Sequence, residues 1–148
     1  MKRPFTLASA QVNKEAGFTL MEMLVVLVVI GLIAMVAIPQ VTRLMGSAKA
    51  KATKIQMETL SSALRFYELD TDAYPSSGEG LKALWAAPGD LPGWNGPYIR
   101  QERQLLDPWG RDFVYQIPGK KAAFDLVSLG ADGKVGGTGD DADIAAIP

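Results

Sequence analysis

The 148-residue chain contains no cysteine and no histidine. Without cysteine it has no disulfide, no thiolate nucleophile and no thiolate metal site. Without histidine it lacks the usual parts of zinc hydrolases, of serine triads with a histidine base and of haem sites with a histidine ligand. Carboxylate chemistry stays open on composition alone. Together the two absences argue against an enzyme.

An excess of charge of one sign is also missing. The chain has 15 basic and 16 acidic residues, which gives a formal net charge of −1. Proteins that bind nucleic acid usually carry a clustered excess of positive charge, because they neutralise phosphates. The mildly acidic balance therefore argues against nucleic acid as the main partner.

A long apolar run lies near the amino terminus. From Met23 to Ile38 sixteen consecutive residues have no polar side chain, and counting back to Phe18 gives twenty-one residues interrupted only by Thr19 and Glu22. Such a run is long enough to cross a hydrocarbon core of about 30 Å. An acidic side chain at that depth costs about 2.5–3.5 kcal/mol on insertion scales, so Glu22 is expected to have a partner or a role.

Two simple interpretations of the run are a secretory signal peptide and a plain membrane anchor. A signal peptide has an apolar core of about 7–15 residues and then a small-residue cleavage site, whereas this run is longer and is followed by Pro39. A plain anchor gives no reason for Glu22. The basic flank of Lys2, Arg3 and Lys14 predicts that the amino terminus stays cytoplasmic and that the remainder lies outside that membrane.

The residues Gly17-Phe18-Thr19-Leu20-Met21-Glu22, followed by the apolar run, resemble the amino-terminal signal of type IV pilins and pseudopilins. This resemblance implies that a prepilin peptidase at the cytoplasmic membrane face cuts between Gly17 and Phe18. It also implies methylation of the new amino terminus at Phe18. Residues 1–17 would then be a leader that is removed, and residues 18–39 a transmembrane and polymerisation helix.

Physical chemistry offers Glu22 a role in that setting. Four residues separate it from Phe18, which is about one helical turn or ~6 Å along the axis. A free amine at Phe18 would be largely protonated near neutral pH, because its reference pKa is about 7.7–8.0. Pairing with this amine, within one chain or between neighbouring subunits, would offset the buried charge of Glu22. The resemblance favours pairing between subunits, where it sets the axial register of a helix bundle.

A helical pattern continues beyond the apolar run. Pro39 is expected to kink or loosen the helix rather than end it, and Gly46-Ser47 is a second position where the helix is expected to bend. The pattern predicts one broken rod from Phe18 to about Asp70, with a second half that is amphipathic and packs on a domain. The apolar residues that recur there at intervals of three and four are Ile55, Met57, Leu60, Leu64 and Tyr67.

Three later blocks narrow the resemblance: Ala73-Tyr74-Pro75, Gly80-Leu81 with Leu84, and Asp107-Pro108-Trp109-Gly110. Together they resemble the major pseudopilins of type II secretion systems, in a match that runs from Gly17 to about Ile144. Locally they predict a Tyr-Pro corner, a short helix at residues 81–86 and a turn in which Trp109 fills the core. Residues 113–117 and 124–129 predict a hairpin with one face on the rod. Further packing points are expected at Trp94, Tyr98 and Ile99.

The glycine-rich segment from Leu129 to Ile144 carries four aspartates, namely Asp132, Asp140, Asp141 and Asp143. Calcium takes six to eight oxygen ligands at about 2.3–2.6 Å, from carboxylates, carbonyls and water. A solvated acidic turn is the simpler alternative, but a cation gives a physical reason for placing mutually repelling carboxylates together. The spacing is not that of an EF-hand.

The resemblance adds that one calcium ion binds in this loop. Asp132 and Asp143 match the family pattern most clearly, and Leu129 would contribute its carbonyl. Asp140 and Asp141 remain alternatives for a further ligand. The chain departs from the family after Ile144, where it ends Ala145-Ala146-Ile147-Pro148.

The sequence therefore predicts an α+β, pilin-like fold. A long amino-terminal helix, with a membrane-spanning half and an amphipathic half, would pack on a small antiparallel β-sheet with a C-terminal calcium loop. Residues 40–148 would form one periplasmic globular domain.

The resemblance implies a non-enzymatic subunit that forms a helical homopolymer, a periplasmic pseudopilus, and drives export of folded proteins across the outer membrane. Its implied partners are minor pseudopilins, the prepilin peptidase, an inner-membrane assembly platform, an outer-membrane secretin and, before assembly, the lipid of the bacterial inner membrane. A type IV pilus or competence pilin is an alternative, but it often carries a C-terminal cysteine pair that is absent here. A membrane-anchored calcium-binding module is another, and it would need neither Glu22 nor cleavage at Gly17.

Overall fold

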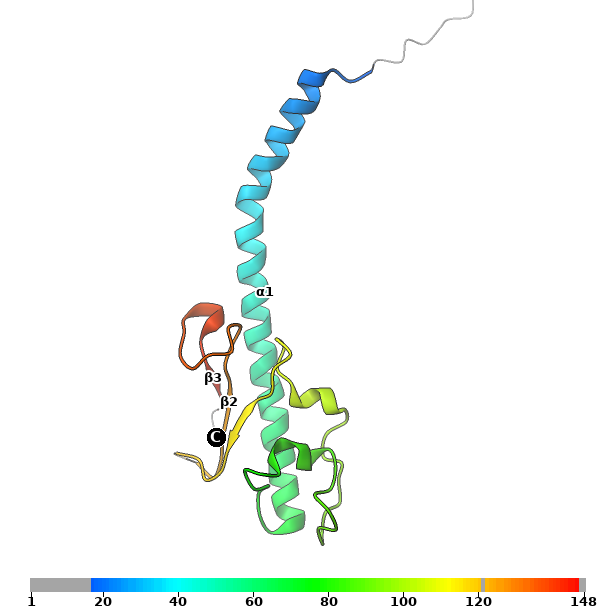
Figure 1. Ribbon diagram of the computed structural model, residues 1–148, viewed down its shortest axis with the longest axis vertical. Coiled ribbons are helices and arrows are strands. Elements are labelled where there is room, and N and C mark those ends of the chain that lie inside the picture. The colour runs from blue at the N-terminus through cyan, green and yellow to red at the C-terminus, as the bar shows by residue number, and fades with distance from the viewer. Residues whose placement is uncertain (1–16, 121, 147–148) are drawn as a thin grey trace, which may run out of the picture. The chain divides into compact units, whose positions relative to one another are not determined.

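The computed structural model describes residues 17–120 and 122–146 (Figure 1). The predicted leader lies outside the described residues except for Gly17. The chain divides into two compact units, Met1–Pro39 and Gln40–Pro148. The elements in chain order are helix α1 (Leu20–Thr71), 3₁₀ helices η1 (Gly80–Leu84) and η2 (Glu102–Leu105), strands β1 (Val114–Gln116) and β2 (Asp125–Ser128), 3₁₀ helix η3 (Gly139–Asp141) and strand β3 (Ile144–Ala145). The predicted α+β class, with a long amino-terminal helix and a small antiparallel sheet, is confirmed.

Helix α1 starts at a polar cap and runs for 52 residues. The Thr19 hydroxyl accepts a hydrogen bond from the Glu22 backbone N–H (3.1 Å), and the Thr19 carbonyl accepts one from Met23 N–H (3.2 Å). This is the N-cap arrangement that satisfies exposed donors in the first turn. Helical structure continues through Pro39, because a proline removes one hydrogen bond without ending the helix here. The helix ends before Asp72, whose φ of 61° is left-handed.

The sheet has three antiparallel strands in the order β1-β2-β3. In the register of β1 with β2, Tyr115 pairs with Leu126, and in that of β2 with β3, Ser128 pairs with Ile144. The predicted hairpin is confirmed, with strands shorter than expected. Strand β3 was not predicted, because two residues are too few to show an alternating pattern.

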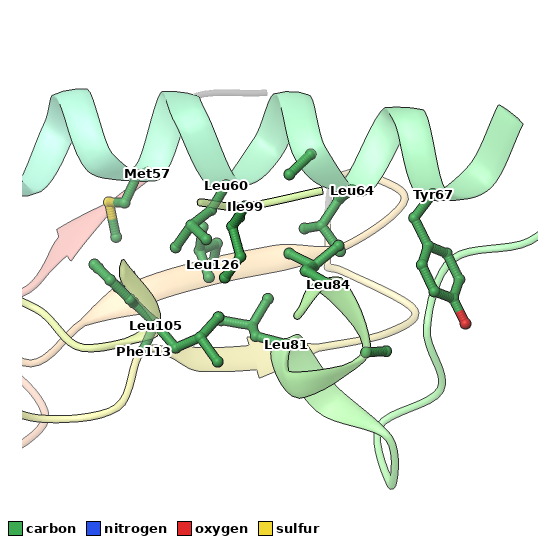
Figure 2. Close-up of a cluster of buried hydrophobic side chains, with 12 residues drawn as sticks. Met57, Leu60, Leu64, Tyr67, Leu81, Leu84, Ile99, Leu105, Phe113 and Leu126 are labelled. Atoms are coloured by element: carbon green, nitrogen blue, oxygen red, sulfur yellow. The ribbon is translucent and has the colours of Figure 1, made fainter. Parts of the chain in front are cut away.

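The core of the second unit forms where one face of α1 packs on the segments that follow it. Met57, Leu60, Leu64 and Tyr67 project from α1 in Figure 2, and each is at most 2% exposed. The buried side chains that meet them are Leu81, Ala83, Leu84, Ile99, Leu105, Phe113 and Leu126. Strand β2 supplies Leu126 from the middle of the sheet, so the sheet packs on the helix as predicted.

The prediction that Ile55 belongs to this core face is wrong. Its side chain is 65% exposed, whereas Met57 is 1% exposed. At 3.6 residues per turn, residues two positions apart in the sequence are separated by about 200° around the helix. Ile55 therefore points almost opposite to Met57, and the three-and-four spacing that fits residues 57, 60, 64 and 67 does not include it.

Two further local predictions need correction. The expected helix at residues 81–86 is the 3₁₀ helix η1, as is common for elements of only a few residues. Trp109 does not fill the core: it is half-buried, and the Lys49 ammonium lies 5.7 Å from its ring centroid. The buried residue of that turn is Asp107, which is 5% exposed.

The predicted packing of the middle segment is confirmed. Ile99 is 4% exposed, and Trp94 and Tyr98 pack against the core. The Trp94 indole donates a hydrogen bond to the Ala83 carbonyl (2.9 Å), and the Tyr98 ring meets Tyr67 edge-on at 5.6 Å. These contacts tie an irregular segment to α1 and η1.

Candidate functional site

The large apolar side chains in the first part of α1 are all exposed. Within the described part of the chain, one helix is long and apolar enough to cross a membrane, and none of its most apolar window is buried. Leu20 is 93% exposed and Met35 is 73% exposed. An apolar surface of this size is expected to be covered by lipid or by protein.

The predicted cleavage pair lies just before this helix. Gly17 and Phe18 are both exposed, and among the described residues, chain neighbours aside, no atom lies within 4 Å of the position that a Cβ at Gly17 would take. Glu22 lies in the first turn, where a negative charge also interacts favourably with the positive end of the helix dipole.

The acidic C-terminal loop closes on itself through backbone hydrogen bonds. Ala131 N–H donates to the Asp140 carbonyl (2.9 Å), and Asp143 N–H donates to the Gly136 carbonyl (3.2 Å). The Asp143 carboxylate in turn accepts a hydrogen bond from Gly136 N–H (2.9 Å). Asp132 accepts one from Lys134 N–H (3.0 Å). Two of the predicted ligands thus shape the loop with one carboxylate oxygen each.

A buried polar network supports the start of this loop. Asp107 accepts hydrogen bonds from the backbone N–H groups of Trp109 and Arg111 (both 3.0 Å) and from the Ser128 hydroxyl (2.7 Å). The Arg111 guanidinium donates to the Gly130 carbonyl (2.9 Å). Buried carboxylates need such partners, since an unpaired one costs several kcal/mol. The turn at residues 107–111 therefore holds the strand end from which the loop departs.

Sequence reasoning missed the support given by Asp107, Ser128 and Arg111. A signal was present for Asp107, because an aspartate side chain in a turn often accepts a hydrogen bond from the backbone N–H two residues later. The contacts of Ser128 and Arg111 span 21 and 19 residues, and no local pattern in the sequence marks them.

Gly130 shows how tightly the loop is packed at its start. Its φ is 64°, a left-handed conformation that favours glycine. A Cβ at this position would also lie 2.8 Å from the Ala142 carbonyl oxygen. Both observations require glycine where the two arms of the loop meet.

The structure separates the candidate calcium ligands into two groups. Asp140 lies against helix α1, where a Cβ added at the buried Gly46 would overlap its carboxylate. Asp132 and Asp143 belong to the body of the loop. All four candidate aspartates are exposed. Among residues 17–120 and 122–146, no three acidic side chains come together as a ready metal cluster.

The donor chemistry of the loop nevertheless fits a hard cation. Every donor in question is an oxygen, and calcium accepts backbone carbonyls and water besides carboxylates. Asp132 and Asp143 each have a second carboxylate oxygen beyond the one that holds a loop N–H. These two side chains and the Leu129 carbonyl remain candidate calcium ligands, as do Asp140, which lies against Gly46 of α1, and Asp141.

Comparison with protein families gives one match in each part of the chain. Residues 40–147 match the family model described as type II secretion system, protein G. Residues 12–38 match the prokaryotic N-terminal methylation motif. The first match covers the globular unit and the second covers the predicted cleavage pair and the apolar helix.

Individual relatives are similar over most of their length. The chain is 43% identical over 138 residues to the type II secretion system core protein G of Pseudomonas aeruginosa, covering 90% of this chain and 96% of the relative. It is 38% identical over 144 residues to the protein of the same name from Xanthomonas campestris, covering 97% of each. The crystal structure of the major pseudopilin from the type 2 secretion system of enterohaemorrhagic Escherichia coli is similar with a TM-score of 0.55 and 32% identity, over 67% of this chain and 86% of that one.

Proposed function

The chain belongs to the family of type II secretion system protein G, the major pseudopilins, and from this premise we propose that it polymerises through the apolar part of α1 after removal of residues 1–17. It is a structural subunit of a homopolymeric pseudopilus in type II secretion. The family and the apolar helix support an inner-membrane anchor before assembly and a periplasmic location afterwards.

The observation that carries the proposal is the exposed apolar helix with a single carboxylate in its first turn. The side chains from Met23 to Ile38 offer no polar contact of their own, so apolar packing gives this segment little resistance to sliding along a neighbour. Glu22 removes that freedom if it pairs with the protonated amine at Phe18 of the next subunit. The pair would also offset the cost of placing Glu22 in an apolar bundle.

The finer steps of the proposal follow from the same helix. A prepilin peptidase cuts between the exposed residues Gly17 and Phe18 on the cytoplasmic side, and Phe18 is then methylated at its nitrogen. An inner-membrane platform adds subunits, minor pseudopilins join the filament, and growth toward an outer-membrane secretin drives folded proteins outward. The subunit itself performs no catalysis in this scheme.

Processing is tested by the intact mass of the protein extracted from membranes of its native host. The expected mass is that of residues 18–148 plus one methyl group. An uncut chain, or a cut beyond Pro39, would remove the proposed polymerisation helix. The membrane-anchored calcium-binding module would then be the better interpretation.

The role of Glu22 is tested by the variant Glu22→Ala, with Glu22→Asp as the control that keeps the charge. We expect Glu22→Ala to be cleaved normally, because the cleavage pair is unchanged. We also expect at least a tenfold loss of sheared pseudopilus compared with the parent chain, since the charge that sets the register is gone. Filaments of normal amount and repeat from Glu22→Ala would contradict this role.

We also propose that the acidic loop binds one calcium ion. Asp132, Asp143 and the Leu129 carbonyl would hold it, with water and further loop carbonyls completing the shell. When bound, calcium would neutralise the mutual repulsion of the loop carboxylates and stabilise the loop on the end of β2. The support for this proposal is the oxygen donor set and the hydrogen bonds that already bring the two arms of the loop together.

The calcium proposal predicts that millimolar calcium raises the thermal midpoint of the processed protein, because a ligand that binds only the native state stabilises it. Asp132→Ala is expected to lose most of this rise. Asp90→Ala is the matched control, since Asp90 is an exposed aspartate outside the loop. Scanning calorimetry with calcium and with chelator makes the measurement, and an unchanged rise in Asp132→Ala would count against the site.

A further inference from the structure

Side chains from outside the acidic loop hold its second residue, Gly130, on both sides. Ser128 and Asp107 are 0% and 5% exposed, and the Ser128 hydroxyl donates a hydrogen bond to the Asp107 carboxylate (2.7 Å). The Ser128 oxygen also accepts a hydrogen bond from the Gly130 N–H (3.4 Å). The Arg111 guanidinium, from the same turn as Asp107, donates one to the Gly130 carbonyl (2.9 Å). Both backbone polar groups of Gly130 therefore have a side-chain partner.

The peptide unit that joins Gly130 to Ala131 is restrained at both of its ends. Its carbonyl accepts the hydrogen bond from Arg111, and its N–H donates to the Asp140 carbonyl (2.9 Å). A trans peptide unit is a rigid plane whose C=O and N–H point in opposite directions. The plane therefore cannot turn without breaking one of these two bonds, and Arg111 supplies one of them.

This peptide plane lies between two candidate calcium ligands. In the sequence, the Leu129 carbonyl comes directly before it and Asp132 directly after it. The Gly133 N–H donates to the Leu129 carbonyl (3.2 Å), which closes a tight turn around the plane. The Arg111 side chain packs on that turn, since a Cβ added at Gly133 would lie 2.6 Å from the Arg111 Nε. Arg111 thus contacts the turn at Gly130 and again at Gly133.

We propose that Arg111 is a positioning residue of the calcium site, which keeps the Leu129 carbonyl and Asp132 in their binding arrangement in the calcium-free protein. The inference rests on the proposed function, because it deepens the calcium proposal. A loop whose ligands are already ordered loses less conformational entropy on binding, so its affinity is higher. Groups that orient metal ligands through hydrogen bonds typically change metal affinity by about 10–100-fold.

The positive charge of Arg111 acts in the opposite direction, because it repels a bound cation. Arg111 is exposed, however, and water and salt weaken the interaction between exposed charges. The ordering of the turn therefore outweighs the repulsion. Removal of the Arg111 side chain is expected to weaken calcium binding, whereas a purely electrostatic role would make the binding stronger.

The first test is isothermal titration calorimetry with calcium chloride on the purified, processed protein in detergent. Arg111→Lys keeps the positive charge but loses the planar group with its fixed donors, and Arg111→Met loses both. Each variant is expected to raise the Kd for calcium at least about tenfold. Arg100→Met is the matched control, since Arg100 is an exposed arginine outside the loop. It should change the Kd by less than about twofold, because exposed charges are screened.

A second measurement uses the calcium-free protein. Amide hydrogen exchange, followed by nuclear magnetic resonance, reports the opening of the bond between the Ala131 N–H and Asp140. Exchange at Ala131 is expected to be at least about fivefold faster in Arg111→Met than in the parent, because local opening exposes the amide. A merely structural role would lower the calcium-free thermal midpoint and leave the Kd unchanged.

The outcomes separate this inference from the calcium proposal on which it rests. If the parent binds calcium, an unchanged or lower Kd in either Arg111 variant would overturn the inference alone. Unchanged exchange at Ala131 in Arg111→Met would do the same. A parent chain that takes up no calcium in the titration would instead overturn the proposed calcium site, and the role of Arg111 in it.

Discussion

Helix α1 is used in two different ways along its length. In the first unit its large apolar side chains are exposed around the helix, and none of the most apolar window is buried among the described residues. From Gly46 onward one face is buried by the chain's own segments, while Ile55, Phe66 and Leu69 stay exposed on the other side. The same helix therefore exposes large apolar side chains around its circumference before Pro39 but on one side after Gly46.

The largest expected difference between the two parts concerns folding. Leu64→Ala removes a side chain that is 0% exposed in the core, and we expect it to lower the free energy of unfolding of the globular unit by about 2–5 kcal/mol. Leu32→Ala deletes the same atoms from a side chain that is 60% exposed. It should change the free energy of unfolding by less than about 0.5 kcal/mol. Denaturant unfolding of both processed variants in the same detergent, followed by near-ultraviolet circular dichroism, makes the comparison. Equal losses of unfolding free energy in the two variants would contradict this difference between the two parts of α1.

A smaller effect is expected at Gly46, where the packed part of α1 begins. Alanine is favoured over glycine inside a helix by about 0.8–1.0 kcal/mol. At Gly46, however, a Cβ would overlap the Asp140 carboxylate, which has to turn away. We expect Gly46→Ala to be nearly neutral in the parent chain and to stabilise the Asp140→Ala variant by about 1 kcal/mol.

A double-mutant cycle with these two substitutions measures the coupling between the helix and the loop. It requires the parent, both single variants and the double variant under one set of calcium-free conditions. Additive changes in the free energy of unfolding would show that Asp140 does not press on Gly46 in solution. The boundary of the packed part would then lie farther along α1.

A further expected effect is a dependence of the stability of the globular unit on alkaline pH. Burial, with added repulsion from Tyr74, Tyr67 and Glu79, raises the pKa of Tyr115 to about 12 from an ordinary value of 10.0. The Tyr115 hydroxyl donates a hydrogen bond to the Pro75 carbonyl (2.8 Å). Between pH 10 and 12 the unfolded chain loses this proton while the folded chain keeps it. The stability contributed below pH 10 is therefore lost as the pH rises through about 12.

Tyr115→Phe is expected to be less stable than the parent at pH 8, because the hydrogen bond to Pro75 is lost. Its stability should also fall less steeply between pH 10 and 12, since one raised pKa has been removed. Urea unfolding at several pH values measures both effects. Parallel pH profiles for the parent and the variant would show that Tyr115 ionises equally easily in the folded and unfolded chains.

Much of this architecture was readable from the sequence, because it depends on local periodicity. The apolar run, the core row of Met57, Leu60 and Leu64, and the hairpin each repeat a pattern with a physical period. The position of Ile55 was misjudged because a three-and-four spacing can be fitted to two opposite faces of the same helix. The burial of the row at residues 57–67 fixes which face packs inward, and Ile55 lies on the other.

The loop region was less predictable, because its contacts join distant residues. The sequence marks Asp107 as a turn residue, but nothing local shows that the Ser128 hydroxyl donates a hydrogen bond to it. It marks Asp140 as a candidate calcium ligand, but nothing local shows that the Asp140 side chain lies against Gly46. Trp109 was misplaced for a related reason. A large aromatic residue in a turn is expected to be buried, yet the buried residue of this turn is Asp107, whose carboxylate accepts the hydrogen bonds that hold the turn.

Strand β3 has a consequence for how the acidic loop can change over time. Val127 pairs with Ala145, and Ser128 pairs with Ile144, so the segment between them leaves and rejoins the sheet at adjacent positions. Such a closed excursion can lengthen or shorten with little cost, because doubling a loop's length adds only about 0.6 kcal/mol of closure entropy. The strand pairing thus lets the loop change in length at small cost to the sheet, whereas a substitution at Asp140 still reaches helix α1 at Gly46.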